Sequence, residues 1–186
     1  MKTKNKVIAI VGMAGSGKSE VALVFEARGY IRVRFGDATD GEMKKRGLPV
    51  CEASERLCRE QLRQELGMAA YAIINQPRID AALKTSNVVA DGLYSWEEYI
   101  SLKSYYGDRF AVVAVNASPK TRYQRLSRRG IRPLTFSAAA SRDKSEIENL
   151  NKGGPIAMAD YTLINESNLA DLKQRTEAIL ISIANM

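Results

Sequence analysis

Histidine is absent from this chain of 186 residues. The absence removes the side chain that most often serves as a general base at neutral pH and as a zinc ligand, so imidazole catalysis and a zinc site are not expected. Only two cysteines occur, Cys51 and Cys58. In a chain that we expect in the cytoplasm, we interpret them as reduced core residues rather than as a redox pair.

Long hydrophobic runs are also missing, and none of the apolar segments is long enough to cross a bilayer. The lysine-rich N-terminus followed by the apolar residues 7–11 imitates a secretory signal. However, that run is short and leads without a cleavage site into a glycine-rich loop. We therefore interpret it as a first strand, and we expect a cytoplasmic protein with no membrane partner.

The composition is that of an ordinary globular protein, with 45% hydrophobic and 26% charged residues, and the length suits a single domain over residues 1–186. The formal net charge is +7. A positive charge favours anionic ligands, but no arginine-rich tail or zinc module indicates nucleic acid, so phosphate ligands are the simpler explanation.

The strongest motif is an eight-residue glycine loop that fits the pattern G-x-x-x-x-G-K-[ST]. It follows the apolar residues 7–11 and precedes a helical pattern over residues 20–27, the context expected of a phosphate-binding loop rather than of a simple glycine turn. In such a loop the backbone N–H groups surround phosphate, the lysine contacts the β- and γ-phosphates and the hydroxyl binds Mg²⁺. The predicted nucleotide-binding residues are Gly12, Met13, Ala14, Gly15, Ser16, Gly17, Lys18 and Ser19.

Five short apolar runs alternate with helical patterns, at residues 7–11, 30–35, 87–90, 110–115 and 161–164. Such alternation predicts an α/β fold with a parallel sheet covered by helices on both faces. The second run alternates strictly, which favours a strand near the sheet edge.

Two longer segments interrupt this alternation. Residues of about 37–86 form a predicted helical insert over a substrate. It has helices at 37–46 and 52–66, and a third helix over 68–75 and 79–84 that is interrupted at Pro77. Residues of about 130–154 are polar and basic with weak apolar periodicity, and we interpret them as a mobile lid.

Two aspartates follow predicted strands, at the sheet edge where ligands bind in this class of fold. Asp91 is a candidate second support for Mg²⁺ beside Ser19, or else an N-cap or turn residue before the next helix. Asp37 is a candidate for orienting or deprotonating an acceptor hydroxyl or for holding water, and it is equally a candidate helix cap.

Arginines dominate residues 121–130, where Arg122, Arg125 and Arg129 share one face of a predicted helix. Either one of them contacts the nucleotide, because a guanidinium binds phosphate oxygens, or together they form a solvated basic face. Arg142, in the predicted lid, is placed to close over a transferring phosphoryl group. Arg63, from the insert, is a candidate acceptor contact, and Trp96 a packing residue.

Taken together, these motifs resemble the P-loop nucleotide and small-metabolite kinases, including adenylate kinase and dephospho-CoA kinase, and most of all an adenylate-kinase-related family of archaeal and bacterial proteins. The resemblance covers nearly the whole chain. It rests on the phosphate loop, Gly36-Asp37, Leu62-Arg63, Asp91-Gly92, residues 117–122 with Arg125-Leu126, Arg142-Asp143, and residues 159–165.

The resemblance implies a three-layer P-loop fold whose five parallel strands have the order 2-3-1-4-5, with an acceptor-binding insert and a lid. It implies Mg-ATP as donor, with Lys18, Arg125 and Arg142 handling ATP and the phosphoryl group and Asn165 near the base. Catalysis in such enzymes is mainly positioning and charge neutralisation.

The chain departs from adenylate kinases at two arginines that grip the acceptor phosphate. Asp40 occupies the first position, and no arginine occurs in the segment around Tyr94 that corresponds to the second. A carboxylate at the first position is expected to repel a phosphate. Arg32 or Arg34 is a candidate substitute.

The sequence therefore predicts a kinase that transfers phosphate from ATP to a nucleotide or small metabolite other than AMP. The alternative is a nucleotide-dependent switch or weak ATPase that acts with a protein or RNA partner. A non-catalytic nucleic-acid-binding module is the least favoured interpretation.

Overall fold

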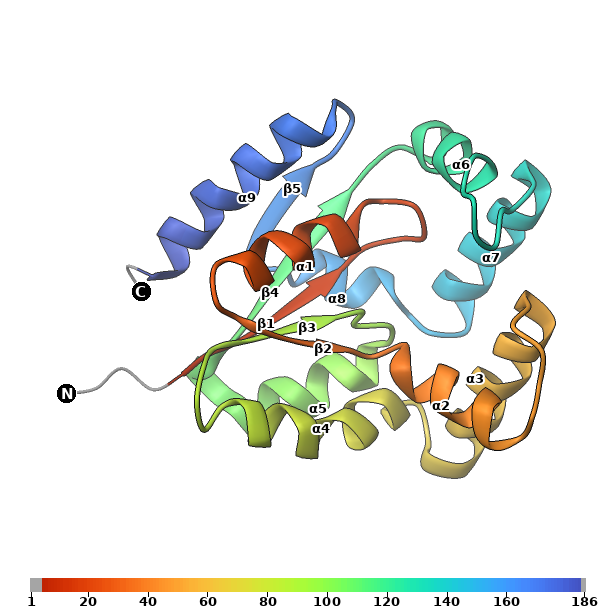
Figure 1. Ribbon diagram of the computed structural model, residues 1–186, viewed down its shortest axis with the longest axis horizontal. Coiled ribbons are helices and arrows are strands. Elements are labelled where there is room, and N and C mark those ends of the chain that lie inside the picture. The colour runs from red at the N-terminus through yellow and green to blue at the C-terminus, as the bar shows by residue number, and fades with distance from the viewer. Residues whose placement is uncertain (1–4, 185–186) are drawn as a thin grey trace.

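A parallel sheet forms the centre of the protein, whose computed structural model describes residues 5–184. Its strands run in the order β2-β3-β1-β4-β5, as expected from the resemblance (Figure 1). In register, Ile10 of β1 lies opposite Asp91 of β3 and Val113 of β4. The strands are β1 (Val7–Val11), β2 (Ile31–Arg34), β3 (Val88–Asp91), β4 (Phe110–Asn116) and β5 (Tyr161–Ile164).

Burial explains which sequence runs became which strands. Every residue of β1 and β3 is buried, because helices cover both faces of the sheet there. Strand β2 lies at the edge and only Val33 of its four residues is buried, which confirms the prediction from its alternating pattern.

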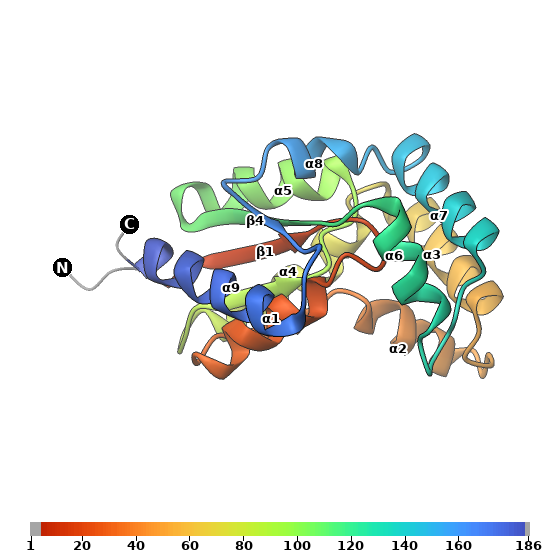
Figure 2. The same cartoon turned by 90° about the horizontal axis from the view of Figure 1, so that it is seen from above.

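Side chains of β1 alternate between two hydrophobic cores. Ile8 and Ile10 pack in the core beneath α1 (Lys18–Ala27) and α9 (Leu169–Ala184), whereas Val7, Ala9 and Val11 pack in the core shared with α4 (Ala70–Ala82) and α5 (Trp96–Tyr106). Figure 2 shows α5 and α8 (Gly153–Ala157) on one side of β1, and α1 and α9 on the other.

The predicted helical insert comprises α2 (Asp37–Lys45), α3 (Glu52–Leu66) and α4. The predicted break at Pro77 is wrong, because α4 runs through it without interruption. A proline leaves the carbonyl four residues earlier without its helical donor, and that residue, Ile73, is 46% exposed, so water can hydrate the carbonyl.

The segment of residues 130–154 is more regular than predicted. After α6 (Pro119–Ser127) it contains α7 (Phe136–Glu148), which begins where the Thr135 hydroxyl accepts a hydrogen bond from the Ala138 amide at 3.1 Å. A short 3₁₀ turn (Gly107–Arg109) completes the elements. No helix among residues 5–184 combines the length and apolar character of a membrane span.

The predictions for Trp96 and for the two cysteines had different outcomes. Trp96 is a packing residue as expected, since its ring stacks on Tyr99 with the centroids 5.2 Å apart. Cys58 is buried as expected, whereas Cys51 is exposed at the start of α3, so the core interpretation of Cys51 is wrong.

Candidate functional site

The glycine loop joins β1 to α1 at the carboxyl edge of the sheet, and its path depends on two glycines. A Cβ atom at Gly12 would lie 2.3 Å from the Val115 carbonyl oxygen, and one at Gly17 would lie 2.4 Å from the Asn165 side-chain nitrogen. Both glycines also have positive φ angles, +149° and +104°. Only glycine therefore lets the loop fold this closely against β4 and the end of β5.

Within this loop several donors have no acceptor. Among residues 5–184, no hydrogen-bond acceptor faces the backbone amides of Gly17, Lys18 and Ser19. These amides begin α1, whose N-terminus carries partial positive charge. The arrangement is suited to an anion with several oxygens.

The ammonium of Lys18 is held inside the loop. Its Nζ donates to the carbonyl oxygens of Gly12 at 2.9 Å and Met13 at 3.1 Å. Burial, reinforced by the positive charges of Lys152 and Arg142, lowers the pKa of Lys18 to about 7, although Glu146 and Asp91 act in the opposite direction. Burial is the main reason why the charged form of Lys18 is disfavoured in the free protein.

Asn165 supports the loop from the end of β5. Its Nδ2 donates to the Ser16 carbonyl oxygen at 2.7 Å, and its residue is 95% buried. Arg125 in turn donates to the Asn165 carbonyl oxygen at 3.0 Å. Of these two predicted nucleotide contacts, Asn165 thus bonds directly to the loop, and Arg125 bonds to Asn165.

Arg122 supports the loop from α6. Its guanidinium donates to the Ala14 carbonyl oxygen at 3.2 Å and forms a buried pair with Asp143, with Nη2 and Oδ2 2.7 Å apart. Arg129 does not share this helical face, because α6 ends at Ser127. The prediction of three arginines on one face is therefore wrong for Arg129.

The carboxylate of Asp91 lies at the end of β3 and is 4% exposed. Arg32 holds its Oδ2 through Nη2 at 2.5 Å and Nε at 3.1 Å. The alternative role as a helix cap is wrong, since Ser95 caps α5 by accepting from the Glu98 amide at 3.1 Å. Asp91 therefore stands beside the glycine loop with one oxygen already paired.

Asp37 makes no capping hydrogen bond in α2, so its interpretation as a cap is wrong. Its carboxylate pairs instead with Arg78 at 2.9 Å and with Arg34 at 3.6 Å. Arg34 also pairs with Asp40 at 2.6 Å, and Arg132 approaches the same carboxylate at 3.7 Å.

These pairs change the expected effect of Asp40. Two guanidinium groups offset its charge, so it does not act as the isolated negative charge that the sequence suggested. The two arginines considered as substitute acceptor contacts are engaged as well, Arg32 with Asp91 and Arg34 with Asp40.

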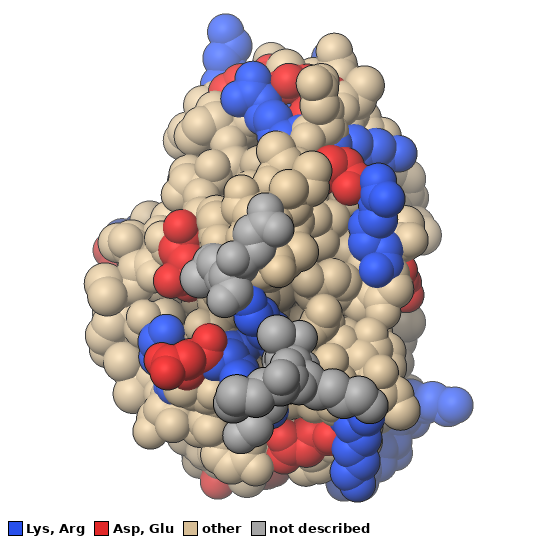
Figure 3. All heavy atoms as spheres, turned by 90° about the vertical axis from the view of Figure 1, so that its left-hand side faces the viewer, with Lys and Arg blue, Asp and Glu red and all other residues tan. Residues whose placement is uncertain are grey.

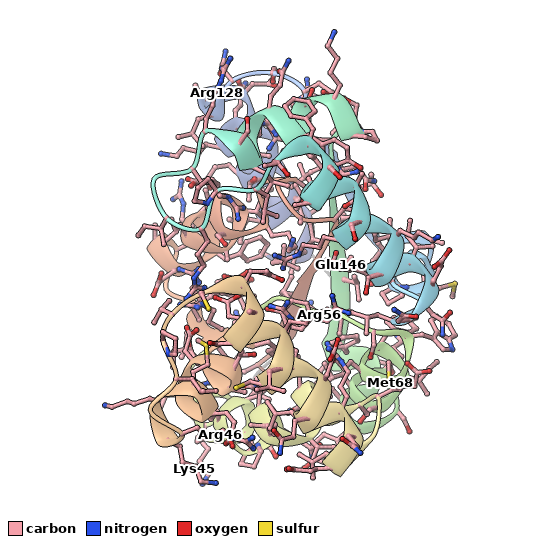
Figure 4. All side chains as sticks on the ribbon, turned by 90° about the vertical axis from the view of Figure 1, so that its right-hand side faces the viewer. Lys45, Arg46, Arg56, Met68, Arg128 and Glu146 are labelled. Carbon is pink, nitrogen blue, oxygen red and sulfur yellow. The ribbon has the colours of Figure 1, made fainter. Side chains whose placement is uncertain are left out.

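A cleft of about 660 Å³ opens between the insert and α7, and two of its lining residues, Arg142 and Glu146, act on the charge of Lys18. Figure 4 shows α3 below it and α7 above, with Arg56 labelled near its centre and Glu146 on α7. Arg142 spans the cleft, since it pairs with Glu146 on its own helix at 3.1 Å and with Glu52 of α3 at 3.6 Å. The predicted candidates Arg63, Arg129 and Arg142 all line this cleft.

The opposite end of the molecule differs. There β1 begins and α9 ends, and Figure 3 shows Lys and Arg beside Asp and Glu on the part of this face that is not grey.

The site also contains a buried ion pair that was not predicted from the sequence. Lys152 is 1% exposed, and its Nζ lies 2.8 Å from the Glu146 Oε2 and 5.4 Å from the centre of the Tyr94 ring. Burial opposes ionisation of Glu146, but Lys152 and Arg142 outweigh it and hold its pKa at about 2. The four-residue spacing of Arg142 and Glu146 was the available signal, while nothing in the sequence marked Lys152.

The chain is similar to known proteins over nearly its whole length. A UPF0200 protein of Pyrococcus furiosus is 36% identical over 183 residues, covering 95% of this chain and 97% of that protein. One of Thermococcus sibiricus is 34% identical over 177 residues, covering 93% of each.

Solved structures resemble it in fold. Protein TT1252 of Thermus thermophilus has a TM-score of 0.67 at 18% identity, covering 97% of this chain and 98% of that one. A gluconokinase of Sinorhizobium meliloti has a TM-score of 0.61 at 18% identity, covering 99% and 96%. The fold is thus that of the P-loop kinases.

The family model described as an AAA domain (AAA_18) matches residues 8–150, which include the glycine loop, the insert and most of α7. The chain therefore belongs to the UPF0200 proteins and carries this AAA domain.

Proposed function

We propose that this protein is a phosphotransferase that binds Mg-ATP at the glycine loop and transfers the γ-phosphate to a nucleotide or small metabolite in the adjoining cleft. The observation that carries the proposal is the position of Lys18. Its ammonium lies within the loop, unpaired with any carboxylate among residues 5–184, beside three amides that lack acceptors. A triphosphate supplies the oxygens that this arrangement lacks.

Magnesium fits the oxygen donors near the loop. The Ser19 hydroxyl is exposed, and the Oδ1 of Asp91 accepts no hydrogen bond from the described residues. Hydroxyl and carboxylate oxygens suit Mg²⁺, which also uses phosphate oxygens and water. No three Cys, Asp or Glu side chains among residues 5–184 form a metal cluster on their own, in keeping with a metal that arrives with the nucleotide. When bound, it would neutralise phosphate charge.

The remaining site residues have proposed roles that follow from their places. Arg142 spans the cleft and stabilises negative charge on the transferring group. Asn165 and Arg125 keep the loop in shape. Asp37 follows Gly36, which lines the cleft, and its proposed role is to release Arg78 and accept the proton of the acceptor hydroxyl.

Lys18→Ala tests the donor site. The variant is expected to lose phosphoryl transfer and most of its affinity for a non-hydrolysable ATP analogue, while the far-UV circular dichroism stays unchanged. Lys144→Ala is the matched control, because that lysine lies on the outer surface of α7 with 73% of its side chain exposed.

Calorimetry that detected no uptake of ATP or GTP with magnesium by the unaltered protein would remove the basis of the proposal. Slow hydrolysis that needs no acceptor and accelerates with a protein or RNA partner would identify a switch instead.

A further inference from the structure

The cleft between α3 and α7 has more arginines than its own carboxylates can pair. Seven arginines and five acidic residues line it. Five of the arginines lie within 4 Å of a carboxylate: Arg34, Arg56, Arg59, Arg132 and Arg142. Arg63 and Arg129 have no carboxylate within 4 Å among residues 5–184. Two guanidinium groups on the cleft wall are therefore available to a ligand.

The two groups come from opposite sides of the cleft. Arg63 belongs to α3, where its guanidinium lies 5.0 Å above the Tyr71 ring and its buried Nε makes no hydrogen bond. Arg129 follows α6, is exposed, and lies close enough to Arg142 for their charges to repel. An anion between Arg63 and Arg129 supplies an acceptor for the buried Arg63 Nε and offsets the repulsion between Arg129 and Arg142.

Within the described part of the chain, the cleft offers no free aromatic ring on which a nucleobase could stack. Of the described lining residues only Tyr94 is aromatic, and its ring is already covered by the Lys152 ammonium at 5.4 Å and the Tyr71 ring at 5.2 Å. Bases bind proteins through stacking on exposed aromatic or guanidinium planes together with apolar walls. Here the hydroxyls of Ser141 and Ser145 line the wall on the α7 side.

We infer that the acceptor is a small hydroxylated oxyanion, a carboxylate or a phosphate ester of a polyol, whose anionic group binds between Arg63 and Arg129. This inference rests on the proposed function and names its substrate class. The hydroxyl at the other end of such a molecule faces Arg142 and the loop, where phosphate is transferred.

Thermal denaturation with a bound, non-hydrolysable ATP analogue and magnesium tests the inference. D-gluconate represents the carboxylates, glucose 6-phosphate the phosphate esters, AMP the nucleotides and erythritol the uncharged polyols. A ligand that binds the folded state raises the melting temperature. We expect the melting temperature to rise with gluconate or with glucose 6-phosphate. The compound that raises it shows whether the anionic group is a carboxylate or a phosphate ester.

A rise with AMP accompanied by its phosphorylation would overturn the inference, and so would no response to either oxyanion. Both results leave the proposed function intact so long as the ATP analogue itself stabilises the protein. Failure of the analogue to bind would instead refute the proposed function.

Variants then locate the anion. Arg129→Ala removes an exposed side chain without a partner, and Arg63→Met retains the stem that packs on Tyr71. Each substitution is expected to lower, by about tenfold to a hundredfold, the affinity for the oxyanion that binds, because one charge-assisted hydrogen bond is lost. The affinity for the ATP analogue should stay unchanged.

Arg56→Ala is the matched control, because it removes the same charge from the same cleft, but from a group already paired with Glu60 at 2.7 Å. An equal loss in all three variants would mean a general effect of charge and would contradict the assignment. Loss of affinity for the analogue in the Arg63 and Arg129 variants would contradict it too.

Discussion

The ammonium of Lys152 lies 2.8 Å from the Glu146 carboxylate, and both side chains are almost closed to solvent. The pair joins the segment that follows α7 to α7 itself. It lies close to the glycine loop, because the charges of both residues affect the pKa of Lys18. A buried pair of this kind is a weak source of stability, but removing one member leaves the other charged and buried without that partner.

Lys152→Met should therefore destabilise the protein by about 3 kcal/mol in urea unfolding, because Glu146 then keeps only Arg142 as a partner. Lys144→Met, from an exposed pair 3.9 Å from Glu148, should change stability by about 0.5 kcal/mol or less. Adding Glu146→Gln to Lys152→Met should recover part of the loss. Equal effects of the two lysine substitutions would show that the burial of Lys152 has no energetic consequence.

The fold was predictable because its signals are local. Continuous apolar runs marked the buried strands, and β1 and β5 begin and end where the runs do. Strand β3 instead runs from Val88 to Asp91, one residue later at each end than the predicted run of residues 87–90. The glycine loop was predictable because its residues are consecutive.

The interior of the site was not predictable, because its contacts join distant residues. Asp91 and Arg32 are 59 positions apart and meet only through the pairing of β2 with β3. Lys152 resembles any solvated lysine in the sequence, and only the fold buries it between Glu146 of α7 and the Tyr94 ring. The rule that proline ends helices failed at Pro77 because packing of α4 outweighed it.

Nucleotide binding should be linked to proton uptake through Lys18. In the free protein its pKa is about 7, and bound triphosphate favours the ammonium and raises the pKa toward the ordinary 10.5. Between these values the bound state holds more protons, so affinity falls as the pH rises, by up to about tenfold per unit.

Calorimetry at pH 8.5 in two buffers of different ionisation enthalpy measures this uptake. Phosphate oxygens, whose last pKa is about 6, no longer contribute there. We expect an uptake approaching one proton per nucleotide. A pH-independent affinity would mean that Lys18 is already charged in the free protein.

Comparing Gly17→Ala with Gly29→Ala should distinguish the effect of the loop's shape on binding from the effect of backbone strain on stability. The Cβ added at Gly17 would stand 2.4 Å from the Asn165 nitrogen that braces the loop, at a φ of +104°. Affinity for the ATP analogue should fall by more than about tenfold, since the brace or the loop must move. Gly29→Ala also has a positive φ, +86°, but open space around it, so it should cost only about 1–2 kcal/mol of stability and leave affinity unchanged. Similar binding by both variants would contradict the bracing role of Asn165.

The pairing of Arg32 with Asp91 implies competition with magnesium. The guanidinium occupies Oδ2 of a carboxylate that we propose as a metal support, so a bound metal must share Asp91 with Arg32 or displace it. Arg32→Gln removes the competitor and should lower, several-fold, the Mg²⁺ concentration needed for half-maximal binding of the ATP analogue. Asp91→Asn should raise it.

Arg32→Gln should also change the stability of the protein. Without Arg32 the Asp91 carboxylate, 4% exposed, is buried and unpaired, so stability without metal should fall by about 3 kcal/mol and recover in part as Mg²⁺ is added with the analogue. Arg28→Gln is the control, because its pair with Glu177 is exposed and far from Asp91 in the sequence. The contrary result would be that magnesium with the analogue stabilises the unaltered protein, the Arg32→Gln variant and the Arg28→Gln variant equally. In that case Asp91 would be only the structural partner of Arg32, and the metal would be bound by Ser19 and the phosphates alone.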